Sequence, residues 1–161
     1  MTNNNNEAMF TLFLNSLNAE EARLAVILDN KLCEKQCGRE IKEAASGYSV
    51  AYKSSADKKT IAAFICRKSG LKIRLTPQKP YRCDDLCDSL PDNMRKDMIR
   101  GNECKRLSNA NVCNQHCLMG YTFTLDGIVY KQCRAMSFLF SVTETKLPYI
   151  LALINRNFDR Q

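Results

Sequence analysis

The sequence predicts an α+β domain in which helices flank an antiparallel sheet. Amphipathic helical patterns occur at both ends and in the middle of the chain, and short strand patterns fill the stretches between them. The connections between neighbouring strands are too short for parallel crossovers, so the strands are expected to pair antiparallel. We expect about six to seven strands in two groups, together with a cysteine-rich hairpin.

The N-terminal part is predicted to hold two helices. Residues 1–6 are expected to be disordered, because a run of asparagines offers no core side chains. A first helix is indicated by apolar residues at helical spacing, namely Phe10, Phe13, Leu14 and Leu17. A second helix is predicted to begin after Asn18 as N-cap, with Glu21 reaching back in a capping box, and to end at Gly38. Cys33 and Cys37 would then lie one turn apart on that helix.

Four strands are predicted next, at residues 39–44, 47–53, 60–67 and 71–76. In the fourth strand, the apolar residues Leu71, Ile73 and Leu75 alternate with the cations Lys72 and Arg74. A period of two places the apolar side chains on one face of the sheet and the cations on the other. The sheet is therefore expected to have one buried face and one face in contact with water.

The second half of the chain is predicted to contain short helices, a hairpin, a strand and a final helix. The helices cover residues 83–90 and then 91–101, with Pro91 in the first turn. Asp126 and Gly127 separate two apolar runs, which predicts a type I′ turn with Leu125 opposite Ile128. A strand at 137–142 and a helix at 145–158 complete the fold.

Length and composition indicate an ordinary globular protein. The 161 residues are expected to form a single domain, residues 1–161. No run of about 18 apolar residues occurs, so no membrane span is predicted. The N-terminal residues lack the basic and apolar regions of a signal peptide, so we expect a cytoplasmic protein. Nine cysteines in such a protein favour metal binding, redox chemistry or simple burial over structural disulfides.

Four cysteines are predicted to converge at the open end of the hairpin. They are Cys104, Cys113, Cys117 and Cys133. Four thiolates from a short knuckle and a distant pair suit a tetrahedral zinc ion, and His116 could replace one of them. Burial as small apolar residues is the alternative for the same cysteines.

Positive charge is concentrated in one segment. The chain carries +7, whereas residues 53–82 alone hold nine basic residues against one acidic residue, so the rest sums to −1. Such a patch is typical of proteins that contact phosphate-rich or otherwise anionic partners, although a solvated sheet face has the same composition. The predicted contact residues are Lys53, Lys58, Lys59, Arg67, Lys68, Lys72 and Arg74, with Tyr48 and Tyr52 for stacking.

These patterns predict a non-enzymatic binding module with a structural zinc site and a basic face for nucleic acid or an acidic protein surface. No small-molecule substrate is evident, and no phosphate-binding loop, nucleophile elbow or metalloprotease motif occurs. A thiol-based redox or sensor protein is the first alternative. Its cysteine pairs would be Cys33/Cys37, Cys83/Cys87 and Cys113/Cys117. An enzyme of unrecognised class is the second.

The cysteine-containing part of the chain also resembles a group of small uncharacterised proteins from anaerobic gut bacteria. The residues that carry the resemblance are Cys104-Lys-Arg-Leu, Cys113-Asn-Gln-His-Cys117, Gly120-Tyr-Thr-Phe123 and Cys133-Arg134. The similarity extends over most of the chain after residue 30. It implies a bacterial intracellular protein with these four cysteines as a shared cluster, and it implies no particular activity.

Overall fold

The computed structural model describes residues 2–77, 84–117, 119–134 and 138–158. The helices and strands, in chain order, are α1 (Thr2–Asn15), α2 (Ala19–Glu34), β1 (Cys37–Ala44), β2 (Gly47–Ser54), β3 (Thr60–Arg67), β4 (Gly70–Leu75), α3 (Asp84–Asp88), α4 (Asp92–Met98), α5 (Lys105–Ser108), β5 (Tyr121–Leu125), β6 (Ile128–Gln132), β7 (Phe138–Ser141) and α6 (Leu147–Phe158).

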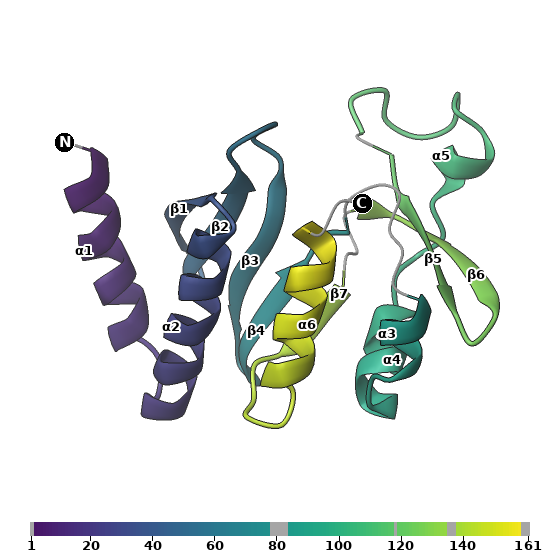
Figure 1. The fold of residues 1–161 in the computed structure, drawn as a ribbon. Coiled ribbons are helices and arrows are strands. Elements are labelled where there is room, and N and C mark those ends of the chain that lie inside the picture. The colour runs from purple at the N-terminus through teal and green to yellow at the C-terminus, as the bar shows by residue number, and fades with distance from the viewer. Residues whose placement is uncertain (1, 78–83, 118, 135–137, 159–161) are drawn as a thin grey trace.

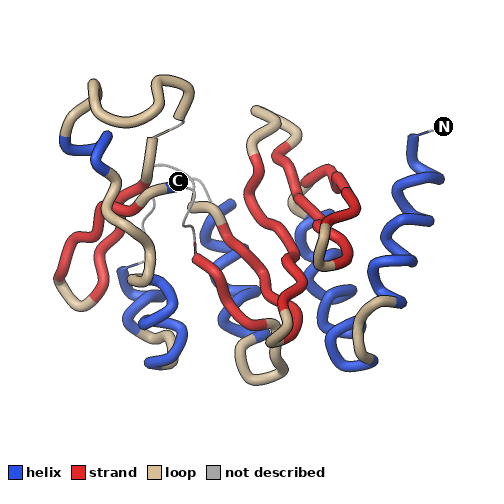
Figure 2. Tube along the Cα trace, turned by 180° about the vertical axis from the view of Figure 1, so that it is seen from behind, coloured by secondary structure: helices blue, strands red, loops and turns tan. Residues whose placement is uncertain are grey.

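Five strands form one antiparallel sheet in the order β1-β2-β3-β4-β7, and β5 pairs with β6 in a separate two-stranded sheet. Helices α2 and α6 lie over one face of the larger sheet, with α1 beside them at the β1 edge (Figure 1). Seen from the other side, no described helix crosses the strands (Figure 2). The α+β class with two strand groups, predicted from the sequence, is confirmed.

The core lies between the sheet and its three helices. Four completely buried side chains form a row across β2, β3, β4 and β7, because each is the pairing partner of the next on the neighbouring strand. They are Val50, Phe64, Ile73 and Phe140. Since alternate residues of a strand point to opposite faces, this row defines the helix-covered face. None of the helices among the described residues is long and apolar enough to span a membrane.

The first helix begins earlier than expected. Helix α1 starts at Thr2, so the prediction of disorder over residues 1–6 is wrong for residues 2–6. Phe13 is completely buried and its ring stacks on that of Phe64 in β3, with 5.6 Å between ring centroids. The amide of Asn6 donates a hydrogen bond to the carbonyl of Arg39. Tertiary contacts with the sheet therefore hold residues whose own helix propensity is low.

The predicted start of α2 is confirmed, whereas its predicted end is wrong. The side chain of Asn18 accepts a hydrogen bond from the backbone N–H of Glu21, as expected of an N-cap. The carboxylate of Glu21 does not complete a capping box; it accepts a hydrogen bond from the N–H of Leu71, 2.8 Å away. The helix ends before Gln36, which adopts a φ of 60°, and Gly38 lies within β1.

The β5–β6 hairpin has the predicted turn and register. Asp126 and Gly127 both have positive φ, 51° and 74°, as a type I′ turn requires. Leu125 pairs with Ile128, and Phe123 pairs with Tyr130. The carboxylate of Asp126 also forms an ion pair with Arg95 of α4, which fixes the hairpin tip on the middle helices.

Candidate functional site

Strand pairing assigns the predicted contact residues to opposite faces of the large sheet. Lys72 and Arg74 alternate with the buried residues of β4, so they lie on the face away from the helices, and Arg67 of β3 shares that face. Lys68 lies in the turn between these two strands and is exposed. We call this set, Arg67, Lys68, Lys72 and Arg74, the basic face.

The remaining predicted cations are divided between paired and unpaired positions. Lys53 forms an ion pair with Glu40 of β1, and Lys59 forms one with Asp57 at 3.5 Å. Hydrogen bonds from Lys42 and Lys53 lower the pKa of Glu40 to about 2. Among the described residues, Lys58 and the four members of the basic face have no ion-pair partner. Within the predicted set, the cations without an ion-pair partner therefore lie mainly on β3, on β4 and in the turn between them.

The surroundings of Arg74 contain no carboxylate on the neighbouring strands. Its partners across the sheet are Ala63 of β3 and Leu139 of β7. The side chain is half-buried, and its Nε has no hydrogen-bond partner among the described residues. Burial lowers the pKa of Arg74, and the positive charge of Arg67 lowers it further. The two arginines thus repel one another, and β3, β4 and β7 contain no carboxylate to compensate their charge.

Tyr48 and Tyr52 do not lie on the basic face. Both point toward the helices, because they alternate with Lys53 and share their face with Val50. Tyr52 is completely buried, and Tyr48 packs against the core. Neither tyrosine ring lies on the face that carries the cations, so the structure does not support the prediction that these rings stack on the bases of a nucleic acid. A base-stacking platform needs exposed rings.

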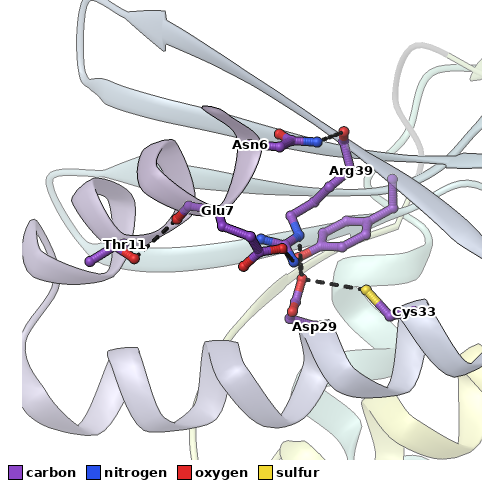
Figure 3. A network of polar contacts seen from close by, with 7 residues as sticks. Asn6, Glu7, Thr11, Asp29, Cys33 and Arg39 are labelled. Carbon is purple, nitrogen blue, oxygen red and sulfur yellow. Dashed lines mark hydrogen bonds and ion pairs between the residues drawn. The ribbon is translucent and has the colours of Figure 1, made fainter. Parts of the chain in front are cut away.

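A buried polar cluster joins α1, α2 and the sheet. The hydroxyl of Tyr52 donates a hydrogen bond to Asp29 Oδ1 at 2.6 Å, and Arg39 Nε lies 3.0 Å from the same oxygen. A second nitrogen of Arg39 contacts Glu7 at 2.8 Å, and its guanidinium carbon lies 4.1 Å from the ring centroid of Phe10. Figure 3 shows Arg39 between Glu7 of one helix and Asp29 of the other.

This cluster was not predicted, although the sequence contains a signal for it. Asp29 directly follows Leu28 on the buried side of α2, where a lone carboxylate requires a partner. Burial raises the pKa of Asp29, while the hydrogen bond from Tyr52 and the charge of Arg39 offset part of that effect. The pairing makes the cluster a structural connection between the two helices and β1.

The thiols beside this cluster are poor nucleophiles. Cys33 lies on α2, whereas Cys37 begins β1, so the prediction that both lie on one helix is wrong. Burial raises the pKa of Cys33, and the carboxylate of Asp29 adds to the effect. Burial also raises the pKa of Cys37 to about 11. A reactive cysteine requires a lowered pKa, so the structure does not favour the redox alternative at this pair.

The four cysteines predicted to bind zinc lie in one lobe but in different environments. Cys104 is buried, Cys117 and Cys133 are half-buried, and Cys113 is exposed. The N–H of Cys104 donates a hydrogen bond to the carbonyl of Lys131, and the N–H of Cys133 donates one to the carbonyl of Asn102. The backbones of the two cysteines are therefore close. Across the part of the chain that the structure describes, no three side chains of the metal-binding types are gathered.

A single arginine organises the loop that contains Cys113, His116 and Cys117. Nη1 of Arg106, on α5, donates hydrogen bonds to the carbonyls of Asn114, Gln115 and Cys117. His116 is exposed. Four thiols remain chemically suited to zinc, and zinc binding stays a prediction that a metal analysis must test.

The remaining predicted cysteine pair includes a disulfide-bonded residue. Cys87 of α3 is completely buried and disulfide-bonded, so the expectation that the cysteines do not form structural disulfides is wrong at this position. Cys83 lies outside the described residues.

Comparisons with known proteins add no relationship to these observations. No protein-family model, curated protein or solved structure matches the chain. The candidate site is therefore argued from the residues and their geometry.

Proposed function

We propose that this protein is a non-enzymatic module that binds nucleic acid through the basic face. The observation that carries the proposal is the distribution of charge on the sheet. Arg67, Lys68, Lys72 and Arg74 have no ion-pair partner among the described residues. No described helix crosses the face of the large sheet that lies away from α2 and α6 (Figure 2). Uncompensated cations on an accessible surface attract a polyanion, and phosphate contacts supply most non-specific affinity.

The chemistry of the face favours recognition of the backbone over recognition of bases. The strand residues that share this face with the cations are small, aliphatic or polar, and the rings of Tyr48 and Tyr52 are on the opposite side. Without stacking side chains, affinity comes from charge, which is denser along a duplex than along a single strand. We therefore expect a duplex to bind at least as tightly as a single strand, with little dependence on sequence.

The hairpin lobe belongs to the same proposal in a structural role. Zinc held by Cys104, Cys113, Cys117 and Cys133, with His116 as a substitute ligand, would fasten the loop of α5 to the hairpin. Support comes from the donor set and from the adjacent backbones of Cys104 and Cys133. The basic face lies on other strands, so nucleic-acid binding and metal binding are tested separately.

Fluorescence anisotropy with labelled duplex and single-stranded oligonucleotides at low salt tests the binding function. The test variant combines Arg67→Gln with Lys72→Gln. The control combines Arg23→Gln with Lys31→Gln, which removes the same charge from α2, where both cations already pair with carboxylates. We expect the dissociation constant of the test variant to be about tenfold higher than that of the unaltered chain, and that of the control to be almost unchanged. Equal loss in both variants, or no binding by the unaltered chain, contradicts the proposal.

A further inference from the structure

A carboxylate lies on the same side of the large sheet as the basic face. Among the described strand residues that point away from α2 and α6, only Glu40 of β1 is acidic. Its Oε1 lies 2.6 Å from the ammonium nitrogen of Lys42, and its Oε2 forms an ion pair with Lys53 of β2. One negative charge thus occupies two ammonium groups. We call these three residues, Glu40, Lys42 and Lys53, the Glu40 triad.

The register of the sheet connects the Glu40 triad to the basic face. Directly paired residues run from β1 to β4 in two neighbouring rows, one from Lys42 to Lys72 and the other from Glu40 to Arg74. The intervening side chains on β2 and β3 are small or aliphatic, namely Ser49, Ile65, Ala51 and Ala63. A strand spacing of about 4.8 Å separates the ends of each row by about 14 Å. A polyanion on the basic face therefore reaches the triad without crossing a charged or aromatic strand residue.

The Glu40 triad is accessible to such a partner. The side chain of Lys42 is 73% exposed, that of Lys53 is 38% exposed and that of Glu40 is 35% exposed. A hollow of about 610 Å³ borders the pair of Glu40 and Lys53, and Lys58 also lines it. Ion pairs that water reaches are weak, because solvent screens the attraction between the charges. A phosphate therefore competes effectively with the carboxylate for the two lysines.

We propose that the nucleic-acid surface continues from the basic face to β1, and that Glu40 limits its affinity by occupying the ammonium groups of Lys42 and Lys53. The inference rests on the proposed function and adds to it a residue that weakens binding. A duplex carries one negative charge per about 1.7 Å of its axis, so it presents phosphates across the whole span from β4 to β1. At the triad, the two lysines attract these phosphates and the carboxylate repels them.

Removing the carboxylate charge tests this assignment. Glu40→Gln keeps the size of the side chain and removes its charge. The matched control is Glu43→Gln, which removes the same charge from an exposed residue of the same strand on the opposite face of the sheet. A third variant combines Glu40→Gln with Lys42→Gln and Lys53→Gln. Binding of a labelled duplex is measured by anisotropy between 50 and 200 mM salt, and circular dichroism verifies that each variant is folded.

We expect Glu40→Gln to bind the duplex about tenfold more tightly at 50 mM salt, with the slope of log K against log salt steeper by about 1–2, because two lysines become free to contact phosphates. The triple variant should lose this gain. Glu43→Gln should change the affinity by less than about twofold, since salt screens a charge on the far face.

The inference and the proposed function fail in different ways. If the unaltered chain binds the duplex but Glu40→Gln gives no gain, or no more than Glu43→Gln gives, the inference is overturned and the proposed function stands. A gain that persists in the triple variant also overturns the inference alone, because the gain then does not come from Lys42 and Lys53. Absence of duplex binding by the unaltered chain overturns the proposed function and this inference with it.

Discussion

Replacing Tyr52 by phenylalanine removes one buried hydrogen bond and keeps the aromatic ring in place. The hydroxyl of Tyr52 lies 2.6 Å from Asp29 Oδ1, and both side chains are buried. The ring packs edge-on against Phe64, with 5.6 Å between centroids, and phenylalanine preserves that contact. The change therefore isolates the contribution of the hydroxyl to the polar cluster.

The expected loss follows from the type of bond. A hydrogen bond to a charged group contributes roughly 1.5–3 kcal/mol, so we expect the free energy of unfolding to fall by about 2 kcal/mol. For a chain of this length, that loss lowers the melting temperature by about 4–8 °C. Equilibrium unfolding in urea, with the melting temperature as a second readout, measures the effect.

Tyr48→Phe is the matched control, because Tyr48 lies on the same strand and the same face and its hydroxyl makes no hydrogen bond to the described residues. We expect that variant to unfold within about 0.5 kcal/mol of the unaltered protein. Equal stabilities for Tyr52→Phe and Tyr48→Phe would refute the view that the Asp29 cluster is a stabilising connection between α2 and the sheet.

Three further predictions address other parts of the molecule. Burial raises the pKa of Asp29 above its ordinary value of 3.8, so the contribution of this group to stability is complete below pH 3.8 and is lost as pH rises through the folded-state pKa. Asp29→Asn should therefore reduce the fall of the unfolding free energy with rising pH. A pH dependence that is the same in the variant and the unaltered chain would contradict the raised pKa. A Cβ at Gly120 would overlap the carbonyl oxygen of Gln132, so Gly120→Ala should lower the free energy of unfolding by about 1–3 kcal/mol. Gly38→Ala, whose Cβ would have its nearest atom at 4.0 Å, should lower it much less, and equal losses in thermal unfolding would contradict this packing. Elemental analysis of protein purified without added metal should find one zinc per chain, lost in Cys117→Ser, and metal-free protein with unaltered stability would rule the site out.

Local patterns predicted much of the fold, because the physical signals were themselves local. The alternation of Leu71, Lys72, Ile73 and Arg74 identified β4 and the direction of its cations. The Asp126-Gly127 pair predicted both the turn and the register of the hairpin, since both residues must adopt positive φ. These features depend on residues within a few positions of one another.

The errors arose where distant segments decide the outcome. Helix α1 extends to Thr2 because Asn6, Glu7 and Phe10 contact Arg39 of β1, which the asparagine run does not reveal. Glu21 bonds to Leu71 rather than to its own helix for the same reason. The end of α2 was misplaced because Gln36, not a glycine, adopts the left-handed conformation.

The candidate site was partly predictable. The segment that carries the positive charge was evident from composition, whereas its division into paired and unpaired cations depends on the partner strand that supplies Glu40. The inward direction of Tyr52 could have been inferred from its alternation with Lys53 and its shared face with Val50. Sequence alone therefore located the basic segment, and strand register selected the residues within it.

The salt dependence of duplex binding tests the central claim most directly. If the four residues of the basic face each contact a phosphate, the slope of log K against log salt is about −3.6, and affinity falls about 150-fold between 50 and 200 mM salt. In the variant with Arg67→Gln and Lys72→Gln the slope should become shallower by about 2, and in the Arg23→Gln and Lys31→Gln control it should not change. A duplex that does not bind at 50 mM salt, or a slope that is the same in all three proteins, would contradict the account.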